Sequence, residues 1–489
     1  MYAEKLLLLL PLLLSLCGAL SLWLLPGVGE KNAGKPALVF AFAVSVSVLA
    51  LLLDQPGTRW ELFTVAEGLP IALRLDGLGS VFLALIAFLW PLATLYADEY
   101  MEGEENLKRF FGFYLLSFGV TAGVALSANL ITMYLFYELL TLSTVPLVAH
   151  SGDRRSMAAA RKYILYSIGG AALSFVGIVI LYTRTGCTDF VYGGVGEGGG
   201  SELLLAYILT FAGFGVKAAI FPFHGWLPAA SVAPTPVTAL LHAVAVVKSG
   251  VFACIRSAFY AFGPALLLGT WAQQTVLALS AFTIVYGSAM AYKEQHWKRR
   301  LAYSTVSNLS YILFGMGLLT AEGLIAGLSH MLFHGVMKIT LFFCAGTVLC
   351  RTGREYVPEC EGLGRKMPLT FAVYTLASLA LTGAPLLPGF VSKLNLINAA
   401  AECGGAFAMG GIVALLLSAL LTAAYLLPMS FRAFLPREGT ELSFTERDHD
   451  PSRRMLLPFA LLCLTLLALG VNATPVMNAL TALLKEAGI

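Results

Sequence analysis

The sequence carries little charge for its length. Charged residues make up 12% of the 489 residues and hydrophobic residues make up 58%, whereas an ordinary soluble domain has roughly 25% charged residues. This composition excludes a soluble enzyme. The formal net charge is only +3, so the chain also lacks the large basic face that nucleic-acid binding requires. The composition predicts an integral membrane protein whose main surroundings are the lipid bilayer.

Paired cysteines are also absent. The eight cysteines are scattered, without any Cys-x-x-Cys pair, so the sequence indicates no zinc site, iron–sulfur cluster or disulfide framework. We therefore predict that this chain holds no cofactor. Any redox chemistry then has to take place on partner subunits.

Long apolar runs fill most of the sequence. Runs of about 17–25 residues, the length that crosses a bilayer as a helix, predict an all-α integral membrane protein with about fourteen transmembrane helices. No polar linker divides the chain, so residues 1–489 should form a single transmembrane domain, beginning with an uncleaved first span. The predicted helices begin near residues 5, 36, 77, 110, 129, 160, 202, 237, 266, 302, 322, 369, 407 and 455.

The cationic residues predict the orientation of these helices. Lys and Arg gather in the loops that follow odd-numbered helices, and cytoplasmic loops are the ones that collect these residues. Both termini should therefore be extracytoplasmic. We expect the membrane to be a prokaryotic plasma membrane.

A few ionisable residues lie inside the apolar spans. The only carboxylate placed in mid-helix is Glu138, and four lysines and four histidines join it: Lys217, Lys248, Lys338, Lys393, His224, His242, His330 and His334. A charge at the bilayer centre costs about 2.5–3.5 kcal/mol by insertion scales, so such groups mark an ion path by default. Two other interpretations stay open. Lysines beside a Pro or Gly break can snorkel from a helix end, and the deeper charges can form a purely structural pair.

His330, His334 and Lys338 follow one another at intervals of four residues. This spacing places them on one helix stripe about 12 Å long. Neutral imidazoles about 6 Å apart can pass a proton through single waters, so the stripe predicts a proton relay. The alternative is that the histidines are hydrogen-bonded core residues. A metal site is disfavoured because the third ligand would be an ammonium group.

Two spans contain helix-breaking residues next to a buried lysine. Prolines interrupt residues 214–243 around Lys217, and Pro385, Pro388 and Gly389 precede Lys393. Interrupted helices in corresponding positions of two halves are typical of inverted-repeat transporters. We predict a first inverted repeat over residues 110–260 and a second over residues 266–434.

Four segments together resemble a known family. They are HGWLPAASVAPTPVTALLHAVAVVKSGVF (224–252), LAYSTVSNLSYILFG (301–315), HMLFHGVMKITLFFCAG (330–346) and GAPLLPGFVSKLNL (383–396). With them, residues 108–435 resemble the antiporter-like proton-translocating subunits of respiratory complex I, of group 4 membrane-bound hydrogenases and of Mrp-type cation/proton antiporters. The resemblance implies fourteen core helices, two inverted five-helix repeats, and broken seventh and twelfth helices.

The resemblance also implies roles for the buried charges. Glu138 matches the family's glutamate on the fifth helix, Lys217 its partner on the seventh, and Lys248 the lysine on the eighth. On the eleventh helix Lys338 matches the family's lysine, with His330 and His334 before it, and on the twelfth Lys393 matches the terminal lysine. Burial disfavours a charged lysine and a neighbouring carboxylate favours it, so pairing of Glu138 with Lys217 can act as a switch.

The same resemblance points to particular branches of the family. Complex I subunits of the M type carry a glutamate where this chain has Lys393, and the long lateral helix of the L type is not expected here. A branch like the D-type subunit of Mrp antiporters, or a hydrogenase-type branch, is therefore favoured.

The hypothesis is a proton-translocating subunit of a redox-driven, complex I-like or hydrogenase-like translocase. It would have other membrane subunits and a peripheral redox arm as partners. We expect proton uptake near His242 and Lys248, lateral transfer through His334, His330 and Lys338, and exit at Lys393.

Three alternatives remain. The first is the D-type subunit of an Mrp-type Na⁺/H⁺ antiporter, for which Na⁺ would be a second coupling ion. The second is a stand-alone inverted-repeat secondary transporter, and the third is a non-conducting membrane scaffold.

Overall fold

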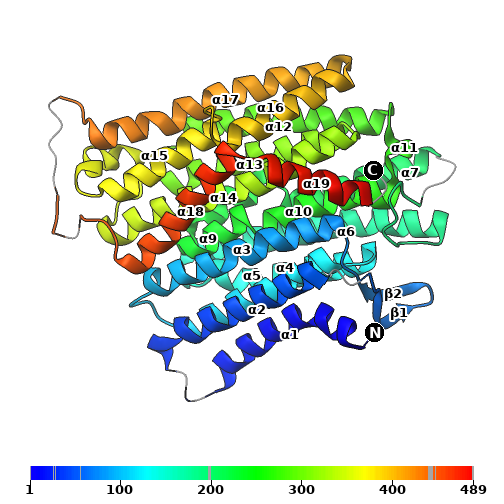
Figure 1. Cartoon of the computed structure of the whole chain (residues 1–489), viewed down its shortest axis with the longest axis horizontal. Coiled ribbons are helices and arrows are strands. Elements are labelled where there is room, and N and C mark those ends of the chain that lie inside the picture. The colour runs from blue at the N-terminus through cyan, green and yellow to red at the C-terminus, as the bar shows by residue number, and fades with distance from the viewer. Residues whose placement is uncertain are drawn as a thin grey trace.

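The structure is a computed structural model that describes residues 2–25, 27, 29–54, 57–195, 200–438, 444–446 and 448–486. Its long helices lie side by side, with their axes close to the horizontal of Figure 1. The α-helices before residue 257 are α1 Tyr2–Leu24, α2 Gly34–Asp54, α3 Gly77–Tyr100, α4 Leu107–Leu126, α5 Leu130–Val148, α6 Arg154–Thr185, α7 Ser201–Lys217, α8 Trp226–Ala229, α9 Thr235–Ala243 and α10 Val246–Arg256.

The π-helical turn η4 spans Ser257–Phe262 and continues α10. The helices after it are α11 Pro264–Leu267, α12 Trp271–Lys293, α13 Trp297–Gly317, α14 Ala321–Thr352, α15 Pro368–Thr382, α16 Pro388–Cys403, α17 Gly405–Phe434, α18 Arg453–Val471 and α19 Thr474–Glu486. Short 3-10 turns occupy Glu30–Asn32, Phe223–Gly225, Ala230–Val232, Val357–Cys360 and Leu363–Arg365.

The predicted all-α membrane architecture is confirmed, although a count of fourteen spans is not. In the described part of the chain, eleven helices are long and apolar enough to cross a membrane. The predicted spans near residues 202, 302 and 369 do not meet these criteria. Helices α7 and α15 have only 17 and 15 residues, and α13 begins at Trp297 with three cationic residues in its first turn.

Polar residues fix where several of the long helices begin. Asp76, Asn129, Asp153, Thr270 and Thr320 each precede a helix, and each side chain accepts a hydrogen bond from the backbone N–H three residues later. The first N–H groups of a helix have no partner within the helix. Each of these caps satisfies one such N–H group at the start of its helix.

One short sheet stands outside the helices. Strands β1 Trp60–Ala66 and β2 Leu69–Leu73 form an antiparallel hairpin between α2 and α3. The residue patterns predicted no strand in this segment, which lies between two long apolar runs. The hairpin lies at the end of the bundle where Figure 1 also places the N-terminus and the C-terminus.

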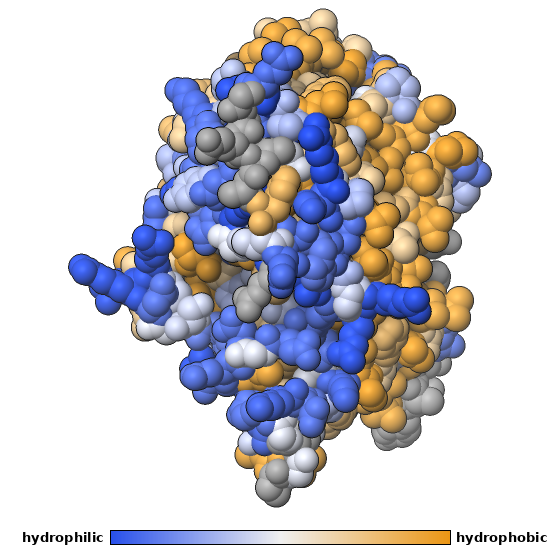
Figure 2. All heavy atoms as spheres, turned by 90° about the vertical axis from the view of Figure 1, so that its left-hand side faces the viewer, coloured by the Kyte–Doolittle hydropathy of each residue, from blue (hydrophilic) through white to orange (hydrophobic). Residues whose placement is uncertain are grey.

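The surface of the bundle separates into a polar end and an apolar flank. Figure 2 looks onto the left-hand end of Figure 1, where hydrophilic residues gather, while hydrophobic residues cover the adjoining flank. Outward-facing residues of α2, α6 and α17 are large and apolar, as at Leu53, Leu165 and Leu420, whose exposure reaches 79% at Leu53. An apolar exterior of this kind is expected of helices that face lipid.

Helix α14 lies inside the bundle and carries the predicted relay stripe. Almost every residue from Gly323 to Val348 is buried, and α14 packs against α3, α9, α13, α15 and α16. Helices that are buried all round in this way can carry polar groups that never meet lipid. The division into two inverted repeats stays a prediction.

Candidate functional site

Glu138 and Lys217 form an ion pair at one edge of the bundle. The Lys217 Nζ lies 3.8 Å from Glu138 Oε1 and 3.4 Å from the centroid of the Tyr137 ring, and it also donates a hydrogen bond to the Tyr137 carbonyl oxygen. Lys217 is fully buried, whereas 26% of the Glu138 side chain is exposed. The pair therefore joins a buried cation to a carboxylate that reaches the outer surface.

The break after α7 explains why a lysine can lie here. Helix α7 ends at Lys217, and no α-helix forms again until Trp226. The carboxyl end of a helix carries a partial negative charge and free carbonyl groups, which favour a cation. The interruption predicted around the prolines is confirmed, and it places Lys217 in the last turn of α7.

Helix α10 connects this pair to the centre of the bundle. At Gly250, a Cβ atom would lie only 3.0 Å from the Lys217 Cβ, so α10 packs directly against Lys217 at a position where only glycine fits. Two residues earlier, Lys248 is fully buried, and its Nζ lies 3.0 Å from His334 Nδ1. Lys248 is thus brought together with the histidine stripe of α14, as the sequence analysis predicts.

Helices α9 and α10 are separated by a break that the sequence analysis missed. It treated the span beginning near residue 237 as continuous, but α9 ends at Ala243 and α10 starts at Val246. The Ala245 N–H bonds to Leu240 O, five residues back. No proline or glycine marks the site, so residue patterns gave no signal. The break lies between His242 and Lys248.

The two histidines continue the path along α14. The ring centroids of His330 and His334 lie 5.8 Å apart. His330 Nδ1 lies 2.9 Å from Ser392 Oγ, and its Nε2 lies 3.2 Å from Asn308 Oδ1. Both nitrogens of this imidazole therefore meet polar side chains, while Nε2 of His334 is buried without a partner. The relay spacing predicted for the two histidines is present.

Lys393 completes the row on α16. Its Nζ donates to the carbonyl oxygens of Leu381 and Thr382, at 2.7 and 2.9 Å, where α15 ends. The second predicted break, between α15 and α16, thus offers the negative end of a half-helix to a buried cation. The same Nζ lies 5.5 Å from the centroid of the Tyr311 ring, which stacks on His330 at 5.0 Å.

Lys338 contacts a different part of the bundle from His330 and Lys393. Its Nζ donates to Leu301 O at 2.8 Å and to Ser304 Oγ, one helical turn beyond His334 and away from Lys393. The sequence analysis put Lys338 between His330 and Lys393, because a straight stripe on one helix cannot show which end faces α16. The contacts join Lys248 to His334, and His334 to His330, whose ring stacks on Tyr311 next to Lys393.

His242 lies near Lys338. Its ring is 4.7 Å from the Phe342 ring, over which Lys338 Nζ lies at 5.9 Å. Both ring nitrogens of His242 are buried and have no protein partner. A buried polar atom without a protein partner is typically bonded to water.

His224 lies apart from the row. It follows the break after α7 and packs against Phe221 and Tyr286, with ring centroids at 5.7 and 4.9 Å. None of its recorded contacts in the described chain is with a relay lysine. The sequence analysis grouped His224 with the others because it shares an apolar span with Lys217, but the chain turns between them.

Sequence reasoning also missed several polar residues of the site. Ser304 and Asn308 lie one turn apart on α13, and Ser392 precedes Lys393. The polar run STVSNLS at 304–310 was a usable signal, because so many hydroxyl and amide groups are unusual within a span. Tyr311, in contrast, could not be distinguished from a core aromatic.

Two family models match this chain. Residues 127–422 match the family described as "NADH:quinone oxidoreductase/Mrp antiporter, TM", and residues 63–111 match "NADH-Ubiquinone oxidoreductase (complex I), chain 5 N-terminus". The chain belongs to the NADH:quinone oxidoreductase/Mrp antiporter family. Every residue of the row from Glu138 to Lys393 lies within the first of these two matches.

Relatives occur in both arms of this family. The chain is 31% identical over 464 residues to NADH-quinone oxidoreductase subunit N of Desulforudis audaxviator, covering 88% of this chain and 90% of the relative. It is 32% identical over 488 residues to the A/B subunit of a probable K(+)/H(+) antiporter of Rhizobium meliloti, covering 96% of this chain but 47% of the relative. The chain thus spans about half the length of that antiporter protein.

Solved structures share the fold. The membrane-bound sulfane sulfur reductase, an archaeal respiratory membrane complex, contains a chain with a TM-score of 0.85 and 23% identity, with coverage of 100% of this chain and 98% of that one. The Mrp complex from Dietzia sp. gives 0.82 and 24% identity, over 98% of this chain and 52% of that one. Respiratory complex I from Thermus thermophilus gives 0.80 and 25% identity, over 98% of both. All three are multisubunit membrane complexes.

Proposed function

We propose that the chain is a proton-translocating membrane subunit of a redox-driven, complex I-like or membrane-bound hydrogenase-like pump. Protons would move along a row that begins at Glu138 and Lys217, continues through Lys248, and passes the histidines of α14 to Lys393. The proposal is supported by the contact of Glu138 with Lys217, by the packing of α10 against Lys217, and by the contact of Lys248 with His334. It is also supported by the relative from Desulforudis audaxviator, which is named as subunit N of an NADH-quinone oxidoreductase.

The exposure of Glu138 carries the proposal that the chain works as a subunit. Its neighbours on the same face of α5 are apolar and exposed, with 37% of Leu135 and 68% of Leu142 accessible. A carboxylate in the middle of a lipid-facing surface is costly unless it is paired or shielded. A neighbouring subunit covering this face would remove that cost, and a cation or protonatable group on it would complete the row across the interface.

A charge switch at Glu138 accounts for coupling. While Glu138 faces Lys217, the carboxylate stabilises the charged lysine. If a partner group attracts Glu138 away, Lys217 loses this support and can pass its proton towards Lys248. Each later lysine then responds to the charge of the one before it.

Several lysines in series suit the work required. Moving one charge against about 200 mV requires about 4.6 kcal/mol. Separating one ion pair changes the free energy of the lysine's proton by about the same amount. When the work is divided over several lysines, each proton transfer requires only a small part of this free energy. This expectation separates a pump from a scaffold, in which replacing the lysines would change nothing.

The second candidate is a cation/proton antiporter subunit of the Mrp type. The observation that favours it is the match of 96% of this chain to part of a probable K(+)/H(+) antiporter. This function would use the same row without electron transfer. Four statements remain predictions: the branch within the family, the location in a prokaryotic plasma membrane, the extracytoplasmic termini and the absence of a cofactor from this chain.

One experiment separates these two functions. The tagged chain is purified from its native membrane in a mild detergent, and the subunits that accompany it are identified by mass spectrometry. Iron–sulfur, flavin or nickel–iron subunits would support the redox-driven pump. Only small hydrophobic Mrp-like subunits, together with proton flux that depends on Na⁺ or K⁺ and needs no electron donor, would support the antiporter.

A further inference from the structure

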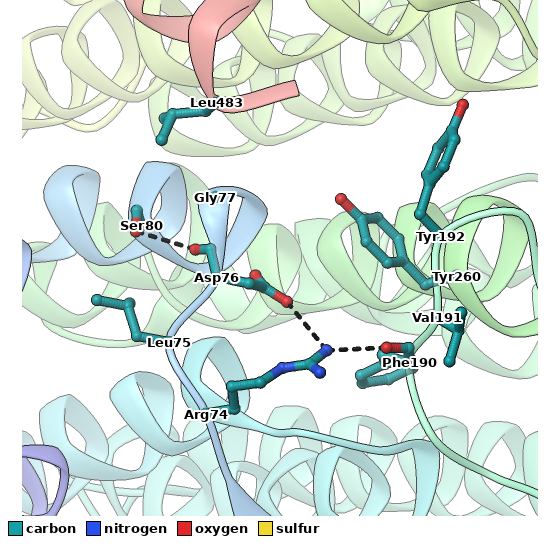
Figure 3. A pocket seen from close by; sticks show the side chains of 10 residues that line it. All are labelled: Arg74, Leu75, Asp76, Gly77, Ser80, Phe190, Val191, Tyr192, Tyr260 and Leu483. Atoms are coloured by element: carbon teal, nitrogen blue, oxygen red, sulfur yellow. Dashed lines mark hydrogen bonds and ion pairs between the residues drawn. The ribbon is translucent and has the colours of Figure 1, made fainter. Parts of the chain in front are cut away.

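A cavity of about 460 Å³ lies at the end of the bundle that carries the hairpin, at the start of α3. Figure 3 shows Arg74 and Asp76 on one side of it and Tyr192 and Tyr260 on the other, with Leu483 of α19 above. This is the end that the predicted topology places outside the cytoplasm. The proposed row of lysines makes no use of this cavity.

A buried ion pair lies directly behind the cavity wall. Both terminal nitrogens of Arg256 donate to the Asp76 carboxylate, each at 2.6 Å, and the Arg256 side chain is fully buried. Its guanidinium carbon lies 5.0, 5.1 and 4.8 Å from the centroids of the Phe190, Phe252 and Tyr260 rings. Aromatic faces and one carboxylate are what allow this arginine to be buried.

Asp76 stays ionised in this setting. Burial alone would raise the pKa of its carboxyl, but the Arg256 guanidinium, the Gly79 N–H and Arg74 together lower the pKa below the usual value. About 20% of the Asp76 side chain is exposed. The carboxylate therefore meets the cavity on one side and Arg256 on the other.

One face of α10 leads from this pair to Lys248. Ser249, Phe252 and Arg256 follow one another at intervals of three and four residues, so they lie on one stripe. Phe252 packs on Phe82 of α3, with ring centroids 5.1 Å apart. An aromatic pair thus stands between the relay lysine and the buried arginine.

Unpartnered polar atoms occur on both sides of the aromatic pair. Ser249 Oγ on the inner side and Arg256 Nε on the outer side are buried and have no hydrogen-bond partner in the protein. Buried polar atoms of this kind are typically satisfied by water. Polar atoms on both sides of an apolar layer fit a pore that closes by dewetting.

We propose that Phe82 and Phe252 form an aromatic gate between Lys248 and the cavity, and that Asp76 is the group that receives a proton when the gate opens. The proposal rests on the proposed function, because it requires Lys248 to carry a proton. On this second exit route, which branches from the row at Lys248 instead of continuing to Lys393, the proton would leave the Lys248 ammonium group, cross the gate on water, and protonate the Asp76 carboxylate. Asp76 would then release it to water in the cavity. A carboxyl group held by an arginine gives up a proton readily, which suits a release group.

The charges around the cavity give this path a direction. Arg74 lies 3.7 Å from Asp76 and donates to the Phe190 carbonyl oxygen, so two cations and one carboxylate surround the outer side of the gate. This excess of positive charge opposes the inward passage of hydronium or metal cations. The gate would therefore resist leak when the outside is acidic.

The test measures passive proton leak in the complete complex without an electron donor. The complex is reconstituted in liposomes that contain a pH-sensitive dye, and an inside-negative potential is imposed with valinomycin and K⁺. In Phe252→Ala we expect proton influx to rise about tenfold, which corresponds to lowering the barrier by about 1.4 kcal/mol. Phe82→Ala should behave in the same way. Phe252→Leu, which leaves a smaller space, should give a smaller rise and should assemble even if the alanine variant does not.

Two further variants sharpen the test. Phe118→Ala removes another fully buried ring, which stacks on Trp90 with centroids 4.7 Å apart, and it should leave the leak unchanged. Asp76→Asn combined with Phe252→Ala should return the leak towards the wild-type value, because the arginines lose their compensating carboxylate.

Wild-type leak in all the Phe252 and Phe82 variants would overturn the gate, and so would equal leak in Phe118→Ala. Neither result would affect the proposed function, whose own test is the loss of pumping in variants of Lys248.

Discussion

Replacing Glu138 with glutamine should prevent the protein from pumping against a membrane potential. The distance of 3.8 Å between Lys217 Nζ and Glu138 Oε1 gives an interaction of about 4 kcal/mol at an effective dielectric constant of about 20. Translocation of one charge against about 200 mV requires about 4.6 kcal/mol. The ion pair is therefore of the size needed to drive one transfer. Loss of about 4 kcal/mol changes the equilibrium of that step about a thousandfold.

The assay is the steady-state potential that the reconstituted complex reaches with its electron donor and acceptor. Wild-type protein should hold a high potential, whereas Glu138→Gln should stall at a low one while still assembling. Glu138→Asp keeps the charge on a shorter side chain and should recover part of the potential. Glu202→Gln is the matched control, because Glu202 is 56% exposed and pairs with Arg184 at the surface. An undiminished potential in Glu138→Gln would refute the switch.

Three further predictions concern the ends of the row and the stability of the bundle. Ser392→Ala removes the partner of His330 Nδ1 and should slow pumping without loss of assembly; equal rates of proton uptake would contradict a role for this contact. Gly389→Ala would place a Cβ atom 1.9 Å from the Ala380 carbonyl oxygen, so α16 must shift. We expect the free energy of unfolding to fall by roughly 1–3 kcal/mol, which lowers the melting temperature, and we expect pumping to be lost. An unchanged melting temperature would contradict this. Burial and then Arg109 lower the pKa of His150 to about 4. Because this lies below the unfolded value of about 6.5, stability should decrease as pH falls from about 6.5 towards 4, and His150→Asn should reduce that decrease in melting temperature.

Much of the fold and of the row could be predicted from residue patterns. An ammonium or carboxylate group inside an apolar span is rare because lipid disfavours it, so Glu138, Lys217, Lys248 and Lys393 were visible without a structure. The breaks beside Lys217 and Lys393 were visible because proline cannot continue a helix. These signals are local in the sequence and depend on single residue types.

Features that depend on contacts between helices could not be predicted. The contacts of the α14 side chains depend on the way α14 faces α10 and α16, so residue spacing could not show that the Lys338 ammonium group meets Ser304. The break at 244–245 has no proline or glycine to mark it. The burial of Arg256 depends on Asp76, 180 residues earlier in the chain. Short sequence patterns do not indicate contacts between residues that are so far apart in the chain.

The measurement that tests the central claim most directly is the number of protons moved per electron by the reconstituted complex when Lys248 is replaced with methionine. Lys248 is the junction of the row, since α10 packs against Lys217 and the Lys248 Nζ lies 3.0 Å from His334. Methionine keeps the length of the side chain but cannot carry a proton. The account predicts that Lys248→Met assembles normally and moves no protons through this subunit, which lowers the ratio. A ratio equal to that of the wild type would contradict the account.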